Sequence, residues 1–447
     1  MSRIRIIITI IVVVLTTLLT GCTGKEPNEI AYVVALGIDS TDDDNYKITI
    51  QYANTTQISG GASESGGKAG SEIVDNVTIE APNIYAGVGL ANNIVSKSFS
   101  MSHAKLIVFS KEVAEKGVKD MIETLVRSEE IRPDVFIAVA NTTANDYLTS
   151  VNPEMEVNPA QYYQLIYQKN QLVGIPDGQL REFFTGLYTD NYDSILPIAG
   201  VIDGSGGNSQ NDDKGQSKDS QNEGSEGSSE SLDSFESKSS NENEKEKDAE
   251  KNTSKYEYDI KNYVGGETTI EKKNKAEAIG AAVFEKDKMV GELGEVETEI
   301  CKMLKGDYTY SYLTYYNNDT PDIPITVKTT QQKKPKYKID TDKKTVDIEL
   351  YIESDLYSLP ADYNVENKIE DFERDVANYT SSACTEFINN FTKKYNSDIL
   401  KLNEKVKYKF LTNNQYNWFK KNVGWSEYKF SVCTNFKVRR TGLIVRK

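Results

Sequence analysis

The first half of the chain alternates between apolar, strand-like runs and amphipathic stretches. Runs that are continuously apolar, or that alternate apolar with polar residues, predict strands over residues 29–39, 46–54, 104–110, 134–140 and 194–202. Apolar residues spaced three or four apart predict helices over residues 83–101, 111–130, 143–151, 160–174 and 178–190. This order of elements favours an α/β to α+β fold with mixed β-sheets and packed α-helices.

The second half predicts a strand, a tight turn at Lys286-Asp287-Lys288, a second strand and a helix within residues 276–304. Further strands are predicted over residues 321–340, 345–359 and 427–445. Before the last of these, apolar residues recur at intervals of three or four over about seven turns. They predict one long helix that begins at an Asn364 N-cap and packs on a sheet.

Residues 203–262 separate the two halves and consist mainly of Ser, Asn, Glu, Gly and Lys, with almost no large apolar side chain. Such a segment cannot bury enough apolar surface to offset the entropy lost on ordering, so we predict a long disordered acidic insertion. The chain is then multi-domain, with an N-terminal region over residues 22–202 and a C-terminal region over residues 263–447.

The amino terminus is typical of a secretory signal peptide. Arg3 and Arg5 form a short basic start. The apolar run over residues 4–19 is shorter than the roughly twenty residues of a membrane-spanning helix. The run ends in Leu19-Thr20-Gly21-Cys22, which resembles the lipobox of bacterial lipoproteins. By that resemblance the signal peptide, residues 1–21, is cleaved after Gly21. Cys22 then carries an S-diacylglyceryl group, and its amino group can also be acylated, for example with palmitate. The alternative is an uncleaved membrane anchor.

Charge limits the partners of the protein. The formal net charge of −16 over 447 residues, with a pI near 4.8, disfavours nucleic acid and electrostatic adhesion to anionic membranes, because both need clustered basic residues. Cleavage after Gly21 removes two arginines and makes the charge −18. We therefore expect covalent lipid, and not the protein surface, to hold the protein at a membrane.

Catalytic and cofactor chemistry finds little support. The single histidine, His103, makes His-based zinc sites and catalytic dyads or triads hard to assemble, and a hydrogen-bonded structural role suits it better. Paired carboxylates could still serve a hydrolase, but no pair stands out. Cys301, Cys384 and Cys433 form no CxxC motif. They fit buried hydrophobic positions, with a Cys384–Cys433 bridge as the alternative.

Two short motifs look like ligand sites and fail on spacing. The cluster at residues 42–45 lacks the D-x-D-x-D-G pattern of a calcium loop, so a hairpin turn is the better interpretation. Lys68 follows two glycines, but Ala62 and Ala69 occupy the positions where a phosphate loop needs Gly and Ser or Thr. We predict no metal and no cofactor.

Several segments, in this order, resemble the GerAC-type (Ger(x)C family) lipoproteins, the C subunits of bacterial spore germinant receptors. After the lipobox they are "PNEIAYVVALGID", "QYANTTQISGG", "MSHAKLIVFSKEVAEKG", "LVRSEEIRPDVFIAVA", "IGAAVFEKDKMVGEL" and "KVRRTGLIV". The resemblance covers nearly the whole mature chain except the insertion, which is longer than is usual for the family.

The resemblance implies a non-catalytic, lipid-anchored receptor subunit that acts in nutrient-triggered spore germination. Its partners would be an integral A subunit and a transporter-like B subunit, at the outer face of the spore inner membrane. Only Cys22 carries over as a family site residue. A solute-binding lipoprotein of a transporter remains the alternative, because length, export signal and lipobox suit both classes of protein.

Overall fold

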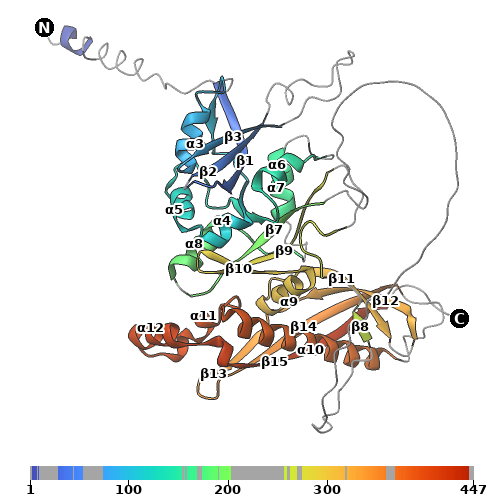
Figure 1. The fold of residues 1–447 in the computed structure, drawn as a ribbon. Coiled ribbons are helices and arrows are strands. Elements are labelled where there is room, and N and C mark those ends of the chain that lie inside the picture. Colours follow the sequence, from blue (N-terminus) through green and yellow to red (C-terminus); the bar gives the residue numbers. More distant parts are fainter. Residues whose placement is uncertain are drawn as a thin grey trace, which may run out of the picture.

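The computed structural model describes part of the chain in residue detail. The described residues are 3–7, 9, 29–43, 45–53, 74–153, 156, 159–168, 174–189, 191–202, 256–258, 262–268, 274–317, 320–358 and 368–441. They form two sheets, each with its own helices, stacked end to end (Figure 1).

The first sheet has nine strands in the order β10-β9-β7-β6-β5-β1-β2-β3, with β4 also pairing β1. Its strands are β1 (Ile30–Ser40), β2 (Tyr46–Ala53), β3 (Val74–Ala81), β4 (Ser98–Ser100), β5 (Leu106–Ser110), β6 (Phe136–Ala140), β7 (Ile195–Val201), β9 (Ala276–Glu285) and β10 (Lys288–Leu293). The central strands β1, β5, β6 and β7 run parallel, whereas hairpins add antiparallel strands at both edges. Parallel strands are buried on both faces, which explains their continuous apolar sequences.

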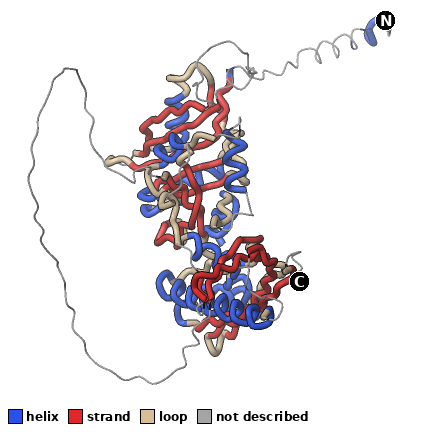
Figure 2. Tube along the Cα trace, turned by 90° about the vertical axis from the view of Figure 1, so that its right-hand side faces the viewer, coloured by secondary structure: helices blue, strands red, loops and turns tan. Residues whose placement is uncertain are grey.

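Helices cover both faces of the first sheet. One face packs against α3 (Ile84–Ala91), α4 (Lys111–Lys116), α5 (Lys119–Arg127) and α8 (Leu180–Thr189), and the other against α6 (Ala144–Ser150) and α7 (Pro159–Gln168). Tyr147 and Tyr163 are the largest fully buried side chains on the second face, where the Tyr163 hydroxyl donates to Gln51 Oε1 at 2.6 Å. Figure 2 shows this layered arrangement from the side.

The second sheet has the order β13-β14-β12-β11-β8, with β15 parallel to β14 on its other edge. Its strands are β8 (Tyr256–Tyr258), β11 (Tyr310–Asn317), β12 (Thr320–Gln331), β13 (Lys336–Asp340), β14 (Thr345–Ser358) and β15 (Lys429–Arg440). The helices are α9 (Glu295–Lys305), α10 (Ile369–Tyr395), α11 (Leu402–Val406) and α12 (Asn413–Asn422), with 3-10 turns η2 (Lys407–Lys409) and η3 (Trp425–Glu427). The α10 stripe of Phe372, Val376, Phe387 and Phe391 is buried, as predicted.

The predicted fold class is confirmed: the protein is a mixed α/β structure with two mixed sheets and packed helices. Most predicted strands are found within a residue or two. The residue 42–45 cluster lies in the hairpin turn between β1 and β2, where Asn45 N donates to Asp43 O at 2.6 Å.

Several predicted boundaries are wrong. The helix predicted over residues 83–101 ends at Ala91 and gives way to β4. The helix predicted over residues 111–130 breaks at Gly117, whose φ of 120° no helix allows. The long helix begins at Ile369, after Lys368, and not at Asn364.

The two sheets do not divide the chain where the acidic insertion does. Strand β8 lies inside the range predicted to be disordered, residues 203–262, and pairs with β11. The rest of that range is mostly outside the described residues. In addition, β9 and β10 follow the insertion in sequence yet complete the first sheet beside β7. Residues after the insertion therefore contribute to both sheets.

Candidate functional site

The predicted lipidation site is not among the described residues. Cys22 and Gly21 both lie outside them, so acylation and cleavage there stay predictions. Within the described ranges, no helix is long and apolar enough to cross a membrane.

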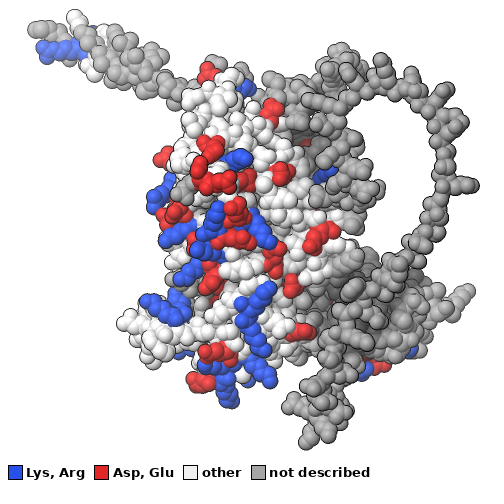
Figure 3. All heavy atoms as spheres, in the orientation of Figure 1, with Lys and Arg blue, Asp and Glu red and all other residues white. Residues whose placement is uncertain are grey.

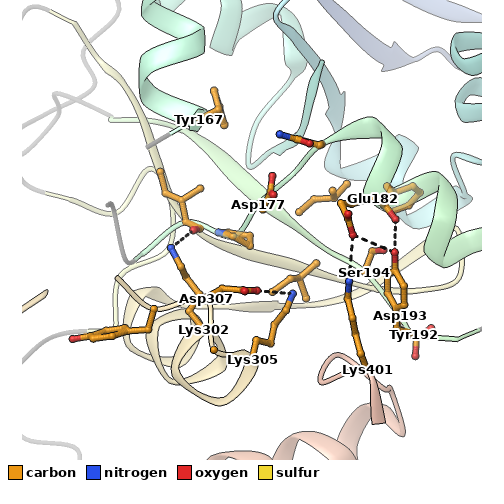
Figure 4. A pocket seen from close by; sticks show the side chains of 18 of the residues that line it. Tyr167, Asp177, Glu182, Tyr192, Asp193, Ser194, Lys302, Lys305, Asp307 and Lys401 are labelled. Atoms are coloured by element: carbon orange, nitrogen blue, oxygen red, sulfur yellow. Dashed lines mark hydrogen bonds and ion pairs between the residues drawn. The ribbon is translucent and has the colours of Figure 1, made fainter. Parts of the chain in front are cut away.

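One cavity lies where the two sheets meet. Its volume is about 420 Å³, and its walls come from the chain around α8 and β7, from the last turn of α9 and from the segment before α11. Figure 4 shows the charged side chains that line it: Asp177, Glu182, Asp193, Lys302, Lys305, Asp307 and Lys401. Acidic and basic groups therefore face the same space.

One wall is an ion pair between the two halves of the chain. Lys401 Nζ lies 3.2 Å from Glu182 Oε2 and 4.1 Å from the centre of the Tyr192 ring. The Tyr192 hydroxyl donates to the Glu182 backbone oxygen at 3.0 Å and to Oε2 at 3.3 Å. Burial alone would raise the pKa of Glu182, but the charge and hydrogen bond of Lys401 lower it overall. Glu182 is therefore held as a carboxylate by its partner.

The opposite wall contains a buried lysine. Lys302 is 5% exposed, and its ammonium donates to the backbone oxygen of Ile175 at 3.0 Å. Burial lowers the pKa of Lys302 from 10.5 to about 8, because the charged form loses its hydration. Nearby, Lys305 and Asp307 form a long ion pair at 3.9 Å. Burial, followed by the charge of Glu182, raises the pKa of Asp177.

Close to Lys401 in the sequence, Asp398 contacts Asp193 and fastens the segment before α11 to the residues before β7. Asp398 N donates to Asp193 Oδ2 at 2.9 Å, and Asp193 N donates to the Asp398 backbone oxygen at 3.2 Å. The buried Asp398 carboxyl accepts from Leu402 N at 2.7 Å and Asn403 N at 2.8 Å. Burial raises the pKa of Asp398 to about 7. This contact crosses more than two hundred residues of sequence.

Chemically, the cavity can bind a small polar molecule that carries both signs of charge, or it can simply hold the two halves in one arrangement. In the ranges that the structure describes, no group of three His, Cys, Asp or Glu side chains could hold a metal ion. Face-on, acidic and basic residues intermingle over the middle of the molecule, whereas its upper end carries few charges (Figure 3).

His103 and the cysteines contribute nothing to this cavity. His103 is exposed, its Nδ1 lies 3.0 Å from Ser102 Oγ, and its ring meets Tyr32 edge-on at 4.8 Å, consistent with a structural role. Cys301 and Cys384 are buried and unbridged, as expected for small hydrophobic residues. Cys433 is exposed and free, so both its predicted burial and the alternative Cys384–Cys433 bridge are wrong. Lys68, in the phosphate-loop match that fails on spacing, lies outside the described residues.

Sequence reasoning missed every charged residue of the cavity. Lys302 follows Cys301 on the buried side of α9, and nothing in the helical pattern distinguishes it from a solvated lysine. Its partner Ile175 is 127 residues away. The one available signal was Lys302 beside the apolar residues of a helix face, and that signal is common in exposed helices.

Comparison with known proteins gives two family matches. Residues 24–201 match the model described as "Spore germination protein N-terminal domain", and residues 279–442 match "Spore germination B3/GerAC like, C-terminal". The two matches lie on either side of the predicted insertion. Together they cover most of the described structure.

Individual relatives are more distant. Spore germination protein KC of Bacillus subtilis is 26% identical over 176 residues, which are 36% of this chain and 43% of that protein. Putative spore germination protein YfkR of B. subtilis is 28% identical over 145 residues, 32% of this chain and 37% of that protein. Spore germination protein B3 of B. subtilis is 26% identical over 148 residues, 31% of this chain and 36% of that protein. The aligned part of the chain thus spans about two-fifths of the length of these curated relatives.

A solved structure also aligns with the chain. The crystal structure of the GerBC protein covers 90% of this chain and 96% of its own, at a TM-score of 0.48 and 15% identity. With both family models matched in order, the chain belongs to the GerAC family of spore germination proteins.

Proposed function

We propose that this protein is the lipid-anchored, non-catalytic C subunit of a nutrient germinant receptor in spore germination. The observation that carries the proposal is the ordered match of both family regions, 24–201 and 279–442, in one chain. Its named relatives are spore germination proteins, which supports a role in the same process.

The anchor is the part of the proposal that rests on the sequence. Leu19-Thr20-Gly21-Cys22 resembles a lipobox, and cleavage after Gly21 would make the acylated Cys22 the first residue. Two acyl chains anchor a protein stably, whereas one chain is marginal. Confinement to the outer face of the spore inner membrane would raise the effective concentration of the subunit near integral A and B subunits.

Replacing the anchor cysteine tests this role. We expect Cys22→Ala to move the protein from the spore membrane fraction to the soluble fraction and to slow germination in response to nutrient. Cys433→Ala is the matched control, because it removes a different cysteine, exposed and free, without touching the lipobox. Full germination by spores that hold only the unlipidated form would contradict the proposed anchor.

Crosslinking in spore membranes tests the partners. A tagged, lipidated copy should be recovered bound to the A or B subunit of its receptor, and a tagged Cys22→Ala copy should be recovered with less of either. Recovery of neither subunit from intact membranes would contradict the receptor role.

A second candidate is a solute-binding lipoprotein of a transporter, and the 420 Å³ cavity of mixed charge is the observation that favours it. Calorimetry on the chain without residues 1–22 would decide between the two. Tight binding of a nutrient by this chain alone, lost in Lys401→Met, would favour the solute-binding role. Absence of binding would leave receptor assembly as the function.

A further inference from the structure

Two large apolar side chains are exposed at the end of α3. Leu90 is 49% exposed, and Ile94, four residues further along, is 69% exposed. Leu90 lies in the last turn of α3 and Ile94 just after its end, and α3 packs on β2 and β3 through Ile84, Val88 and Ala91. Leu90 and Ile94 therefore belong to the opposite, outward side of an otherwise well-packed element. We call these two residues the apolar tip.

The apolar tip is held firmly in place. A Cβ added at Gly87 would lie 2.7 Å from Ile48 Cδ1, so α3 lies unusually close to the sheet. Asn83 caps the helix by accepting from Ala86 N at 2.9 Å. After the helix, Asn92 Oδ1 accepts from Phe99 N at 2.8 Å, which ties the turn to β4. The exposure of Leu90 and Ile94 is thus a property of a fixed surface.

Strand pairing places the apolar tip beside the point where the chain enters the fold. Strand β4 pairs in parallel with β1, and Ser98 lies opposite Ile30. The segments that precede Ile30 and Ser98 therefore lie at the same end of the sheet, where β1 and β4 begin. Ser98 follows Ile94 by four positions, which corresponds to at most about 14 Å of chain. Figure 1 shows α3 and the start of β1 at the same end of the molecule.

The chain outside the structure points to what this edge meets. Glu29 follows Cys22 by seven positions, and an extended chain of that length spans at most about 25 Å. If Cys22 is acylated, the bilayer surface lies within that distance of the start of β1. A lipid-anchored protein on so short a tether must face the membrane with the end of the first sheet at which β1 and β4 begin.

Charge supports the same orientation. Residues 81–105, from the end of β3 to the residue before β5, contain no Asp or Glu and two Lys, in a chain with 68 acidic residues among 447. An anionic bilayer surface would repel much of this acidic protein, but this stretch adds no negative charge of its own. Glu29 lies at the same end of the sheet, and Glu130 accepts from Met101 N at 2.7 Å just after β4, so apolar contact, rather than electrostatic attraction, has to provide the binding.

We propose that the apolar tip, Leu90 and Ile94, inserts into the headgroup region of the lipid bilayer and fixes the orientation of the protein on the membrane. This inference rests on the proposed lipid anchor at Cys22. It adds a second, peptide contact to that anchor, and it defines which surface remains turned toward protein partners.

Site-directed labelling of the full, lipidated chain tests the proposal. The background is Cys433→Ser, since Cys433 is the exposed free thiol of the described residues while Cys301 and Cys384 are buried. An environment-sensitive fluorophore is placed on Ile94→Cys. The matched control is Leu411→Cys, which is 95% exposed and lies beside α12 at the opposite end of the molecule.

The labelled proteins are reconstituted into vesicles of phosphatidylethanolamine and phosphatidylglycerol, some of which contain nitroxide-labelled lipid. We expect the label at position 94 to shift to shorter wavelength and to lose emission to the nitroxide, and the label at position 411 to do neither. Leu90→Ser should reduce the quenching at position 94, because it removes the apolar side chain of the tip that labelling at position 94 leaves in place.

Each outcome decides a different point. Flotation of the protein with vesicles but equal quenching at positions 94 and 411 would overturn the membrane contact and leave the anchor intact. Failure of the processed wild-type chain to float would overturn the anchor and the contact that rests on it. A blue shift at position 94 without vesicles, increasing with protein concentration, would indicate that a second copy of the chain covers the tip and would also overturn the proposal.

Discussion

The buried Lys302 makes a sharp prediction about stability and pH. Its ammonium lies inside the protein, and burial lowers its pKa from 10.5 to about 8. The folded chain therefore binds this proton less tightly than the unfolded chain does. Below pH 8 the folded protein keeps this proton only at a cost in the free energy of unfolding. The difference between the unfolded pKa of 10.5 and the folded pKa of about 8 sets this cost at about 3.4 kcal/mol.

The sign of the pH dependence follows directly. As pH rises from about 8 toward 10.5 the folded lysine has already lost its proton while the unfolded one has not, so the cost disappears. Between pH 7.5 and 9.5 we expect wild type to gain about 2 kcal/mol relative to Lys302→Met. This window lies above the titration of the neighbouring Glu299, whose pKa burial raises to about 7.

The assay is urea unfolding of the chain without residues 1–22, at both pH values, for wild type and Lys302→Met. Loss of the bond to Ile175 O should cost the variant about 1.5–3 kcal/mol, so it should be close to wild type in stability at pH 7.5. Lys305→Met, from the same turn of α9 but a more exposed position, measures the effect of losing any positive charge there. A wild-type minus Lys302→Met difference that stays constant or falls as pH rises would refute the reasoning.

Two further predictions concern the cysteines and the glycines. In native protein lacking residues 1–22, Cys433 should react with a thiol reagent at once, whereas Cys301 and Cys384 should react only on unfolding. The reason is that burial raises the pKa of Cys301 to about 11 and that of Cys384 to about 12. Equal reaction rates for all three cysteines, read by mass spectrometry, would contradict the burial of Cys301 and Cys384. Gly117→Ala should lower the free energy of unfolding by about 1–2 kcal/mol, because the φ of Gly117 is 120°. Gly89→Ala should raise it by about 0.5–1 kcal/mol, because Gly89 lies in a helix and its new Cβ would meet no atom within 4 Å. Calorimetric melting shifts of the same sign for both variants would contradict this account.

Prediction from sequence succeeded where a segment is buried in only one way. The central strands β1, β5, β6 and β7 are covered on both faces, so their apolar runs leave few alternatives. The long helix α10 packs one face on a sheet, and its apolar spacing of three and four shows that face. In each case local sequence and final environment agree.

It failed where partners distant in sequence decide the structure. The edge strand β3 has Val77 and Ile79 alternating with polar residues, but it follows a Gly-rich stretch and is only half-buried, so its signal is weak. The strand β11 has Tyr at half of its positions and only one aliphatic residue, Leu313, and it is fixed by pairing with β12 and β8. Neither pairing is visible in the local pattern.

The cavity could not be predicted either, because its charged residues are brought together by contacts between distant parts of the sequence. Its ion pair joins Glu182 to Lys401, and its buried lysine joins residue 302 to the backbone at residue 175. Each of these residues has an ordinary local context. Only the meeting of the two sheets makes them neighbours.

Apolar packing around the hairpin β9–β10 limits how far the first and second sheets can move apart. It lies in the first sheet beside β7, yet the next residues form α9, which packs toward the second sheet. One apolar cluster runs continuously from Ile195 and Val283 in the first sheet to Leu350 and Phe430 in the second. Separating the sheets would expose this cluster at about 25 cal/mol per Å² of apolar surface, whereas the partly exposed ion pair of Glu182 and Lys401 contributes at most about 1 kcal/mol. A ligand in the cavity could therefore displace that ion pair easily, but it could not separate the two sheets. If the apolar tip orients the first sheet on a membrane, this rigidity orients the second sheet as well, and partner subunits would meet one fixed surface.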